Sequence, residues 1–209
     1  PAESSRKESV MIIWINGAFG AGKTTAAYEL HRRLAGSLVY DPEEVGYFLR
    51  RSAPCFRTPD FQDLPLWRAL NYELLREIDA ENPGDVIVPM TLVNAQYYHE
   101  IVVRLQSEGV CVRHFILYAS RETILKRLRR RSLGLLRRED FAVAAINRCL
   151  HAFDTGAIPG MRIDTNRMSV SQVVETVAER CEIALQPDSR SVARRSLDRL
   201  GVWLRHIRG

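Results

Sequence analysis

Long apolar stretches are missing from this sequence. No segment approaches the roughly 18 uncharged apolar residues that a membrane-spanning helix needs. The first nine residues, PAESSRKES, also lack the apolar run of a signal peptide. These absences argue against an integral membrane protein and predict a cytoplasmic one, in which residues 1–9 form a disordered extension.

Closely spaced metal-ligating residues are also missing. The four cysteines, Cys55, Cys111, Cys149 and Cys181, lie far apart and form no C-x-x-C pair, and no two histidines stand four residues apart. The spacing therefore argues against a structural zinc site and against a disulfide framework. We expect these thiols to be free and to pack as small apolar side chains.

Most of the chain has little excess charge of either sign. The net charge is +5, but residues 189–209 alone hold six arginines and one aspartate, which accounts for the whole excess. Everything before residue 189 is therefore neutral. A neutral body with a basic tail, and no recognisable RNA- or DNA-binding motif, argues against nucleic acid as a partner.

Short apolar runs alternate with segments of helical periodicity, and this order predicts an α/β domain. The continuous apolar run at residues 10–15 is typical of a strand buried on both faces of a parallel sheet. Residues 10–187 are expected to form one domain with a five-stranded parallel sheet covered on both faces. Strands are predicted at 10–15, 38–40, 86–90, 110–118 and 161–164, and helices at 24–35, 66–78, 97–107, 120–131, 139–151 and 169–184.

Residues 17–24, GAFGAGKT, meet the phosphate-binding P-loop pattern G-x-x-x-x-G-K-[ST] between a predicted strand and helix. Lys23 is expected to reach the β and γ phosphates and assist catalysis, and the Thr24 hydroxyl to bind Mg²⁺. The alternative, a glycine-rich structural turn, is disfavoured by this context. The motif predicts a three-layer P-loop NTPase fold that binds ATP with Mg²⁺. The expected nucleotide contacts are Gly17, Ala18, Phe19, Gly20, Ala21, Gly22, Lys23, Thr24 and Thr25.

Asp41 follows the second predicted strand, which we expect to lie beside the P-loop strand. Its carboxylate could accept a proton from a substrate hydroxyl or bind the magnesium shell. Equally, an Asp-Pro pair can start a turn and cap the helix that begins near Glu43. The third strand ends without the aspartate of a usual Walker B strand, and Asp85 stands at its opposite end.

The segment 121–138 holds eight Lys or Arg residues and one Glu, a density that suits a lid over residues 120–140. Arg127 and Arg131 are predicted to stabilise the transferring phosphate, and Arg130 to contact the nucleotide. The alternative for each arginine is an ordinary solvated helix face. Asp164, at the end of the last strand, and Asn166, just after it, are candidates to contact the edge of the adenine base.

Several segments together resemble the tunicamycin-resistance proteins of Bacillus and its actinobacterial relatives. They are MIIWINGAFGAGKT, YDPEEVGYFLR, DFQDLPLWRALNYELL, VIVPMT, ETILKRLRRR and DRLGVWLRHIR. The resemblance implies a fold like that of nucleoside and nucleotide kinases, with Asp41 as the base. It also implies ATP-dependent protection against tunicamycin, by phosphorylation of the drug or by binding it at the membrane. A pocket for a uracil or sugar ring is then expected from Phe56, Phe61, Trp67, Tyr72 and Met90, although aromatic residues at helical spacing are often plain core.

The last 22 residues, 188–209, read as a basic amphipathic helix. Apolar residues recur at steps of three or four between arginines, and Trp203 falls on the apolar side. Such a helix suits the inner face of an anionic membrane, or it packs on the domain or on a second copy in a homodimer. The resemblance favours peripheral attachment to the membrane.

Overall fold

The computed structural model describes residues 10–53, 55–56, 58–131, 139–191, 194–195, 197–198 and 201. The strands are β1 (Met11–Gly17), β2 (Leu38–Val39), β3 (Val86–Pro89), β4 (Cys111–Tyr118) and β5 (Met161–Asp164). The first helices are α1 (Lys23–Arg33), α2 (Pro42–Ser52), the 3-10 helix η1 (Phe61–Asp63), α3 (Pro65–Glu81) and α4 (Ala95–Tyr98). The π-helical turn η2 (His99–Val103) and α5 (Arg104–Ser107) continue α4, and α6 (Arg121–Arg131), α7 (Glu139–Asp154) and α8 (Val170–Cys181) follow.

The five strands form one parallel sheet in the order β2-β3-β1-β4-β5. β1 lies at its centre because its side chains are apolar toward both faces. Ile13, for example, is fully buried and pairs with Ile87 of β3 and Arg113 of β4. Because all strands are parallel, their carboxyl ends meet at one edge, where ligands of such sheets bind.

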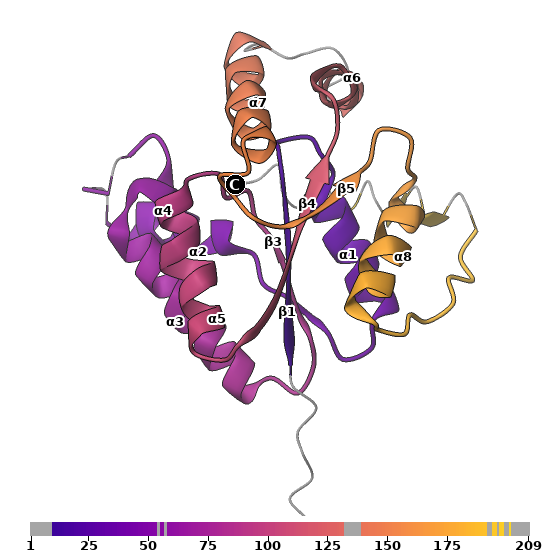
Figure 1. Ribbon diagram of the computed structural model, residues 1–209, viewed down its shortest axis with the longest axis horizontal. Helices are drawn as coiled ribbons and strands as arrows, with labels where there is room; N and C mark the ends of the chain where they lie inside the picture. The colour runs from indigo at the N-terminus through magenta and orange to yellow at the C-terminus, as the bar shows by residue number, and fades with distance from the viewer. Residues whose placement is uncertain are drawn as a thin grey trace, which may run out of the picture.

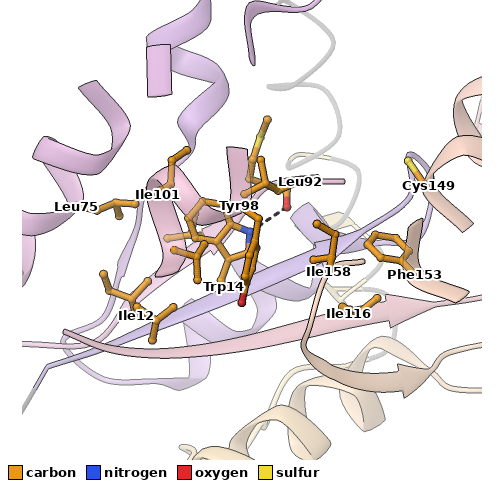
Figure 2. Close-up of a cluster of buried hydrophobic side chains, with 14 of the residues drawn as sticks. Ile12, Trp14, Leu75, Leu92, Tyr98, Ile101, Ile116, Cys149, Phe153 and Ile158 are labelled. Atoms are coloured by element: carbon orange, nitrogen blue, oxygen red, sulfur yellow. Dashed lines mark hydrogen bonds between the residues drawn. The ribbon is translucent and has the colours of Figure 1, made fainter. Parts of the chain in front are cut away.

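An apolar layer covers each face of the sheet. Successive side chains of β1 point to opposite faces and so pack in opposite layers. Ile12 and Trp14 pack with the side of α3, α4 and α5, whereas Ile13 and Ile15 pack with α1 and α8 (Figure 1). Trp14 is fully buried, and its indole N–H donates to the Met90 carbonyl at 3.2 Å (Figure 2). Burying each such side chain contributes roughly 1.5–3 kcal/mol to folding. This burial stabilises the sheet whose carboxyl edge is expected to bind the ligand.

The sequence-based prediction of an α/β fold with a parallel five-stranded sheet is confirmed. One expectation was wrong: β3, not β2, lies beside β1, and β2 is the edge strand. The burial of the strands explains this order. All four residues of β3 are buried, as an inner strand requires, while β2 has only two residues and Leu38 is exposed.

Among the helices of the described residues, none is long and apolar enough to cross a membrane. The chain after α8 returns to α1: the Gln186 N–H donates to the Arg33 carbonyl at 2.8 Å, and Arg33 Nε donates to the Gln186 carbonyl at 3.1 Å. Of the predicted C-terminal helix, residues 194–195, 197–198 and 201 are helical. Residues 188–191 are not helical, so the predicted start at 188 was wrong: the Asp188 carboxylate accepts from the Arg190 N–H at 3.1 Å and forms a turn there. Residues 192–193, 196, 199–200 and 202–209 of this prediction lie outside the described residues.

Arg190 fixes the start of this C-terminal segment on α1. Its guanidinium pairs with Glu29 of α1, with Asp188 at 2.7 Å and with Asp198 at 2.8 Å. Arg195 adds a second bond to Asp188 at 2.9 Å. The Glu29 side chain is only 3% exposed, so the segment covers a buried carboxylate of the helix that follows the P-loop.

Candidate nucleotide-binding site and acceptor side

The P-loop curls between the end of β1 and the start of α1. Gly22 has φ +104°, a left-handed conformation that only glycine adopts readily, and a Cβ there would meet no atom within 4 Å. Gly20 also has a positive φ, +86°, and packing constrains it further, because a Cβ would lie 2.9 Å from the Leu128 side chain of α6. The first turn of α1 carries no acidic residue, so no carboxylate there would repel the phosphate that the motif is predicted to bind at this helix end.

Lys23 and Thr24 stand at the first two positions of α1, where the motif predicts contacts with phosphate and magnesium. Lys23 Nζ donates to the Ala18 carbonyl at 3.3 Å, so its ammonium group lies within the loop. Phe19, at the tip, is 62% exposed. The loop connects β1 to α1, as the motif requires, and the contact of each of its residues with phosphate stays a prediction.

Asp41 lies at the carboxyl end of β2 and caps α2, accepting a hydrogen bond from the Glu43 N–H at 3.0 Å. The buried indole of Trp67 donates to the Pro42 carbonyl at 3.0 Å and fixes the start of α2. The capping alternative is therefore observed. It is compatible with a role as base, because a carboxylate has two oxygens and four lone pairs.

The exit of β3 approaches the P-loop without an acid. Instead, the Thr91 hydroxyl donates to the Gly17 carbonyl at 2.8 Å. Asp85 lies at the opposite end of β3, as predicted, and accepts a hydrogen bond from the Met11 N–H at 3.0 Å. Thr91 was not among the predicted site residues, although it directly follows the apolar run predicted as the third strand.

Helix α6 packs on the P-loop through Ile124 and Leu128, which are both buried. Arg127 donates to the Ala21 carbonyl at 3.3 Å, and to the hydroxyl and the carbonyl of Thr165 at 3.1 and 2.5 Å. In this conformation Arg127 holds the P-loop against the chain after β5, and its role toward the transferring phosphate stays a prediction. Arg130 is exposed.

The lid prediction is only partly visible. Residues 132–138 of the predicted 120–140 lid lie outside the described residues, as does the side chain of Arg131. Helices α6 and α7 lie at the same end of the molecule, beyond the carboxyl edge of the sheet (Figure 1). Helix α6 thus lies at the ligand end of the sheet, and its action as part of a lid stays a prediction.

Asn166 and Asp164 organise the turn after β5. Asn166 Oδ1 accepts from the Ser120 N–H at 2.9 Å, and Asp164 accepts from the Asn166 N–H at 2.9 Å. Asn166 Nδ2 also donates to Asp164 Oδ1, at 2.7 Å, and the two bonds from Asn166 lower the pKa of Asp164. The turn is thereby joined to the start of α6, and the predicted contact with adenine stays a prediction.

The residues predicted to wall an acceptor pocket separate into two groups. Trp67, Tyr72 and Met90 are at most 2% exposed and belong to the core, which is the second of the two interpretations. The Tyr72 hydroxyl bonds Glu108 at 2.6 Å, just before β4 begins and so away from the P-loop edge. Phe56 and Phe61 are half-buried, and the ring of Phe61 lies 5.4 Å from that of Trp67.

A polar cluster that the sequence analysis did not single out lies beside Thr91. Gln62 Nε2 donates to the Thr91 carbonyl at 3.1 Å, and the Gln62 carbonyl accepts from Arg68 at 2.7 Å. Arg68 is buried, pairs with Glu100 at 2.5 Å and lies 4.3 Å from the centre of the Tyr97 ring. η1 and α3 are thus connected to the P-loop through Thr91.

Known proteins share this arrangement. The chain matches the AAA domain family over residues 12–155, and no curated protein matched it significantly. Gluconokinase from Sinorhizobium meliloti 1021 is 16% identical, with 82% of this chain and 91% of that chain covered and a TM-score of 0.56. Shikimate kinase from Bacteroides thetaiotaomicron is 18% identical, with 83% and 99% covered and a TM-score of 0.51. These two show the fold alone.

A closer likeness exists to the tunicamycin resistance protein of Deinococcus radiodurans. It is 35% identical, with 86% of this chain and 99% of that chain covered and a TM-score of 0.73. The shared fold and the P-loop establish a nucleotide-binding, kinase-like architecture. Together with this identity, they place the chain in the family of the tunicamycin resistance proteins, among the P-loop proteins of the AAA domain family.

Proposed function

We propose that this protein transfers the γ-phosphoryl group of ATP to a hydroxyl group of tunicamycin or a related nucleoside compound. The observation that carries the proposal is the placement of Asp41. Its carboxylate is fixed at the same sheet edge as the P-loop, by its bond to the Glu43 N–H and by the anchoring of Pro42 on Trp67. A base at that edge is what transfer to a hydroxyl requires.

In this proposal the P-loop binds the phosphate donor, and the region around Asp41 binds the acceptor. On the donor side, the P-loop amides and Lys23 hold the triphosphate. On the acceptor side, the substrate hydroxyl attacks the γ-phosphorus, the bond to the ADP oxygen breaks, and Asp41 accepts the hydroxyl proton. Positive charge from α6 would stabilise the charge that develops on the transferring group.

Magnesium would bind together with the nucleotide. Thr24 is half-buried in the first turn of α1 and offers one hydroxyl oxygen. Within the described residues, no group of three or more His, Cys, Asp or Glu residues could hold a metal ion. This fits Mg²⁺, which takes most of its ligands from phosphate and water. When bound, the ion would neutralise charge on the β and γ phosphates.

Tunicamycin-dependent release of ADP tests the assignment of Asp41. Asn keeps an oxygen for the helix cap, so Asp41→Asn should retain the melting temperature and the Kd for ATP. Its turnover should fall by roughly 10²–10⁴, the usual contribution of a positioned base. Lys23→Ala should lose ATP binding. Turnover of Asp41→Asn near the wild-type rate would restrict Asp41 to capping.

A second candidate function is sequestration of the drug at the membrane, with ATP used only to close the lid. Two observations favour it: Asp41 already caps a helix, and β3 ends without a Walker B acid. A wild-type protein that binds tunicamycin in the presence of ATP but releases no drug-dependent ADP would support this function and refute the kinase.

A further inference from the structure

Asn16, the last residue before the P-loop, lies at a junction of three segments and is fully buried. Its Oδ1 accepts from the N–H groups of Gly17 at 2.7 Å and Leu92 at 3.0 Å. Its Nδ2 donates to the Leu92 carbonyl at 2.7 Å and lies 3.1 Å from His114 Nε2. The amide therefore uses both acceptor positions and both donor protons, which sets its orientation.

This orientation determines the state of His114. Because Asn16 presents an N–H, His114 Nε2 must be the acceptor, and the ring proton must stand on Nδ1. His114 Nδ1 faces the Pro159 carbonyl at 2.5 Å, which accepts that proton. His114 is 5% exposed and lies against the ring of Tyr98 at 5.1 Å. The imidazole is thus a neutral link between Pro159 and Asn16.

The far end of this link belongs to the chain that follows α7. Gly160 passes so close that a Cβ there would lie 2.7 Å from His114 Nδ1. Figure 2 shows Ile158 beside Phe153 of α7 and Ile116 of β4, and all three are buried. The segment that carries Pro159 is therefore held in place by the helix on the lid side.

We propose that Asn16 and His114 are positioning residues of the nucleotide site. Together they hold the backbone N–H of Gly17, the first residue of the P-loop, at a fixed position relative to Leu92 after β3 and to Pro159 after α7. The proposal rests on nucleotide binding and is independent of phosphoryl transfer.

The physical reason is the position of Gly17. Its N–H is held by Asn16 and its carbonyl accepts from the Thr91 hydroxyl, so the residue that opens the phosphate loop is fixed on both sides. Without Asn16, the buried N–H groups of Gly17 and Leu92 lose their acceptor. The loop would then change conformation to satisfy them, and its later amides would no longer converge on phosphate oxygens.

The Kd of the full-length protein for ATP with Mg²⁺, measured beside its melting temperature, tests the proposal. Asn16→Leu and His114→Leu should bind ATP at least roughly tenfold more weakly, the scale of a lost buried hydrogen bond. His114→Gln retains one donor and one acceptor and should recover most of the affinity. Asn71→Leu is the matched control, because Asn71 is also fully buried and makes two side-chain bonds, to Trp67 and Tyr40.

A purely structural role predicts that all of these variants lose melting temperature while the folded protein binds ATP normally. The proposal is overturned if His114→Leu binds ATP within twofold of the wild type, or if Asn71→Leu weakens binding as much. It is also overturned if His114→Gln restores nothing, since hydrogen bonding would then not be the cause. Should Asn16→Leu not fold, the two His114 variants decide.

Discussion

Replacing Arg190 by methionine should destabilise the whole domain, although Arg190 stands in what the sequence alone presents as a tail. Methionine keeps the apolar stem but removes the charge that pairs with Glu29, Asp188 and Asp198. Glu29 and Asp188 are only 3% and 7% exposed, so water cannot replace the lost partner.

The size of the stability loss depends on which ion pairs the three carboxylates keep without Arg190. Removal of one partner from a buried ion pair typically costs about 3–5 kcal/mol. Glu29 keeps Arg32 at 3.0 Å, and Asp188 keeps Arg195 at 2.9 Å, which places the loss near the lower value. A loss of about 3 kcal/mol corresponds to roughly 6–12 °C in melting temperature for a chain of this size.

The assay is thermal unfolding at neutral pH, with Arg194→Met as the matched control. Arg194 pairs with the same Asp198 at 3.4 Å, but its side chain is 69% exposed, so its loss should cost about 1 kcal/mol or less. Adding Glu29→Gln to Arg190→Met should recover part of the stability, because the most deeply buried of the three carboxylates that lose Arg190 is then uncharged. Equal shifts for Arg190→Met and Arg194→Met would refute the reasoning.

Three further predictions concern the pH, the core and the tail. Burial lowers the pKa of His114 from its ordinary value near 6.5 to about 4. The folded protein therefore favours the neutral imidazole, and the unfolded chain takes up the proton first as the pH falls. About 3 kcal/mol of folding stability that is present above pH 6.5 should be lost as the pH falls toward 4. The neighbouring Tyr98 does not titrate in that range, and an unchanged pH profile in His114→Gln would contradict this. Tyr72→Phe removes only the bond to Glu108, so it should lower the melting temperature slightly and leave the KM for the acceptor unchanged. A raised KM would show that Tyr72 contributes to the acceptor pocket. Replacing Arg205 and Arg208 by Gln should reduce sedimentation with anionic vesicles, because each basic residue adds attraction to the surface, and equal sedimentation would count against membrane attachment.

Local sequence patterns predicted several elements of this structure. The buried run before Gly17 and the glycine pattern after it predicted β1, the P-loop and the first turn of α1. β5 begins and ends at the predicted residues, 161–164. Each of these features depends on neighbours within a few positions, where periodicity and turn chemistry are decisive.

Long-range pairings were not predictable in the same way. The place of β3 between β1 and β2 depends on which strand buries both faces. Arg190 and Glu29 are 161 positions apart, and Asn16 and His114 are 98 apart. A single buried Asn or His gives no periodic signal, so only the fold shows that these polar groups satisfy one another.

The mass of tunicamycin after incubation with the protein, ATP and Mg²⁺ tests the central claim most directly. We expect the drug to gain the mass of one phosphoryl group with the wild type and to remain unchanged with Lys23→Ala, which lacks the cation expected at the β and γ phosphates. Unmodified drug that co-purifies with the wild-type protein, under conditions in which ATP is bound, would contradict phosphoryl transfer.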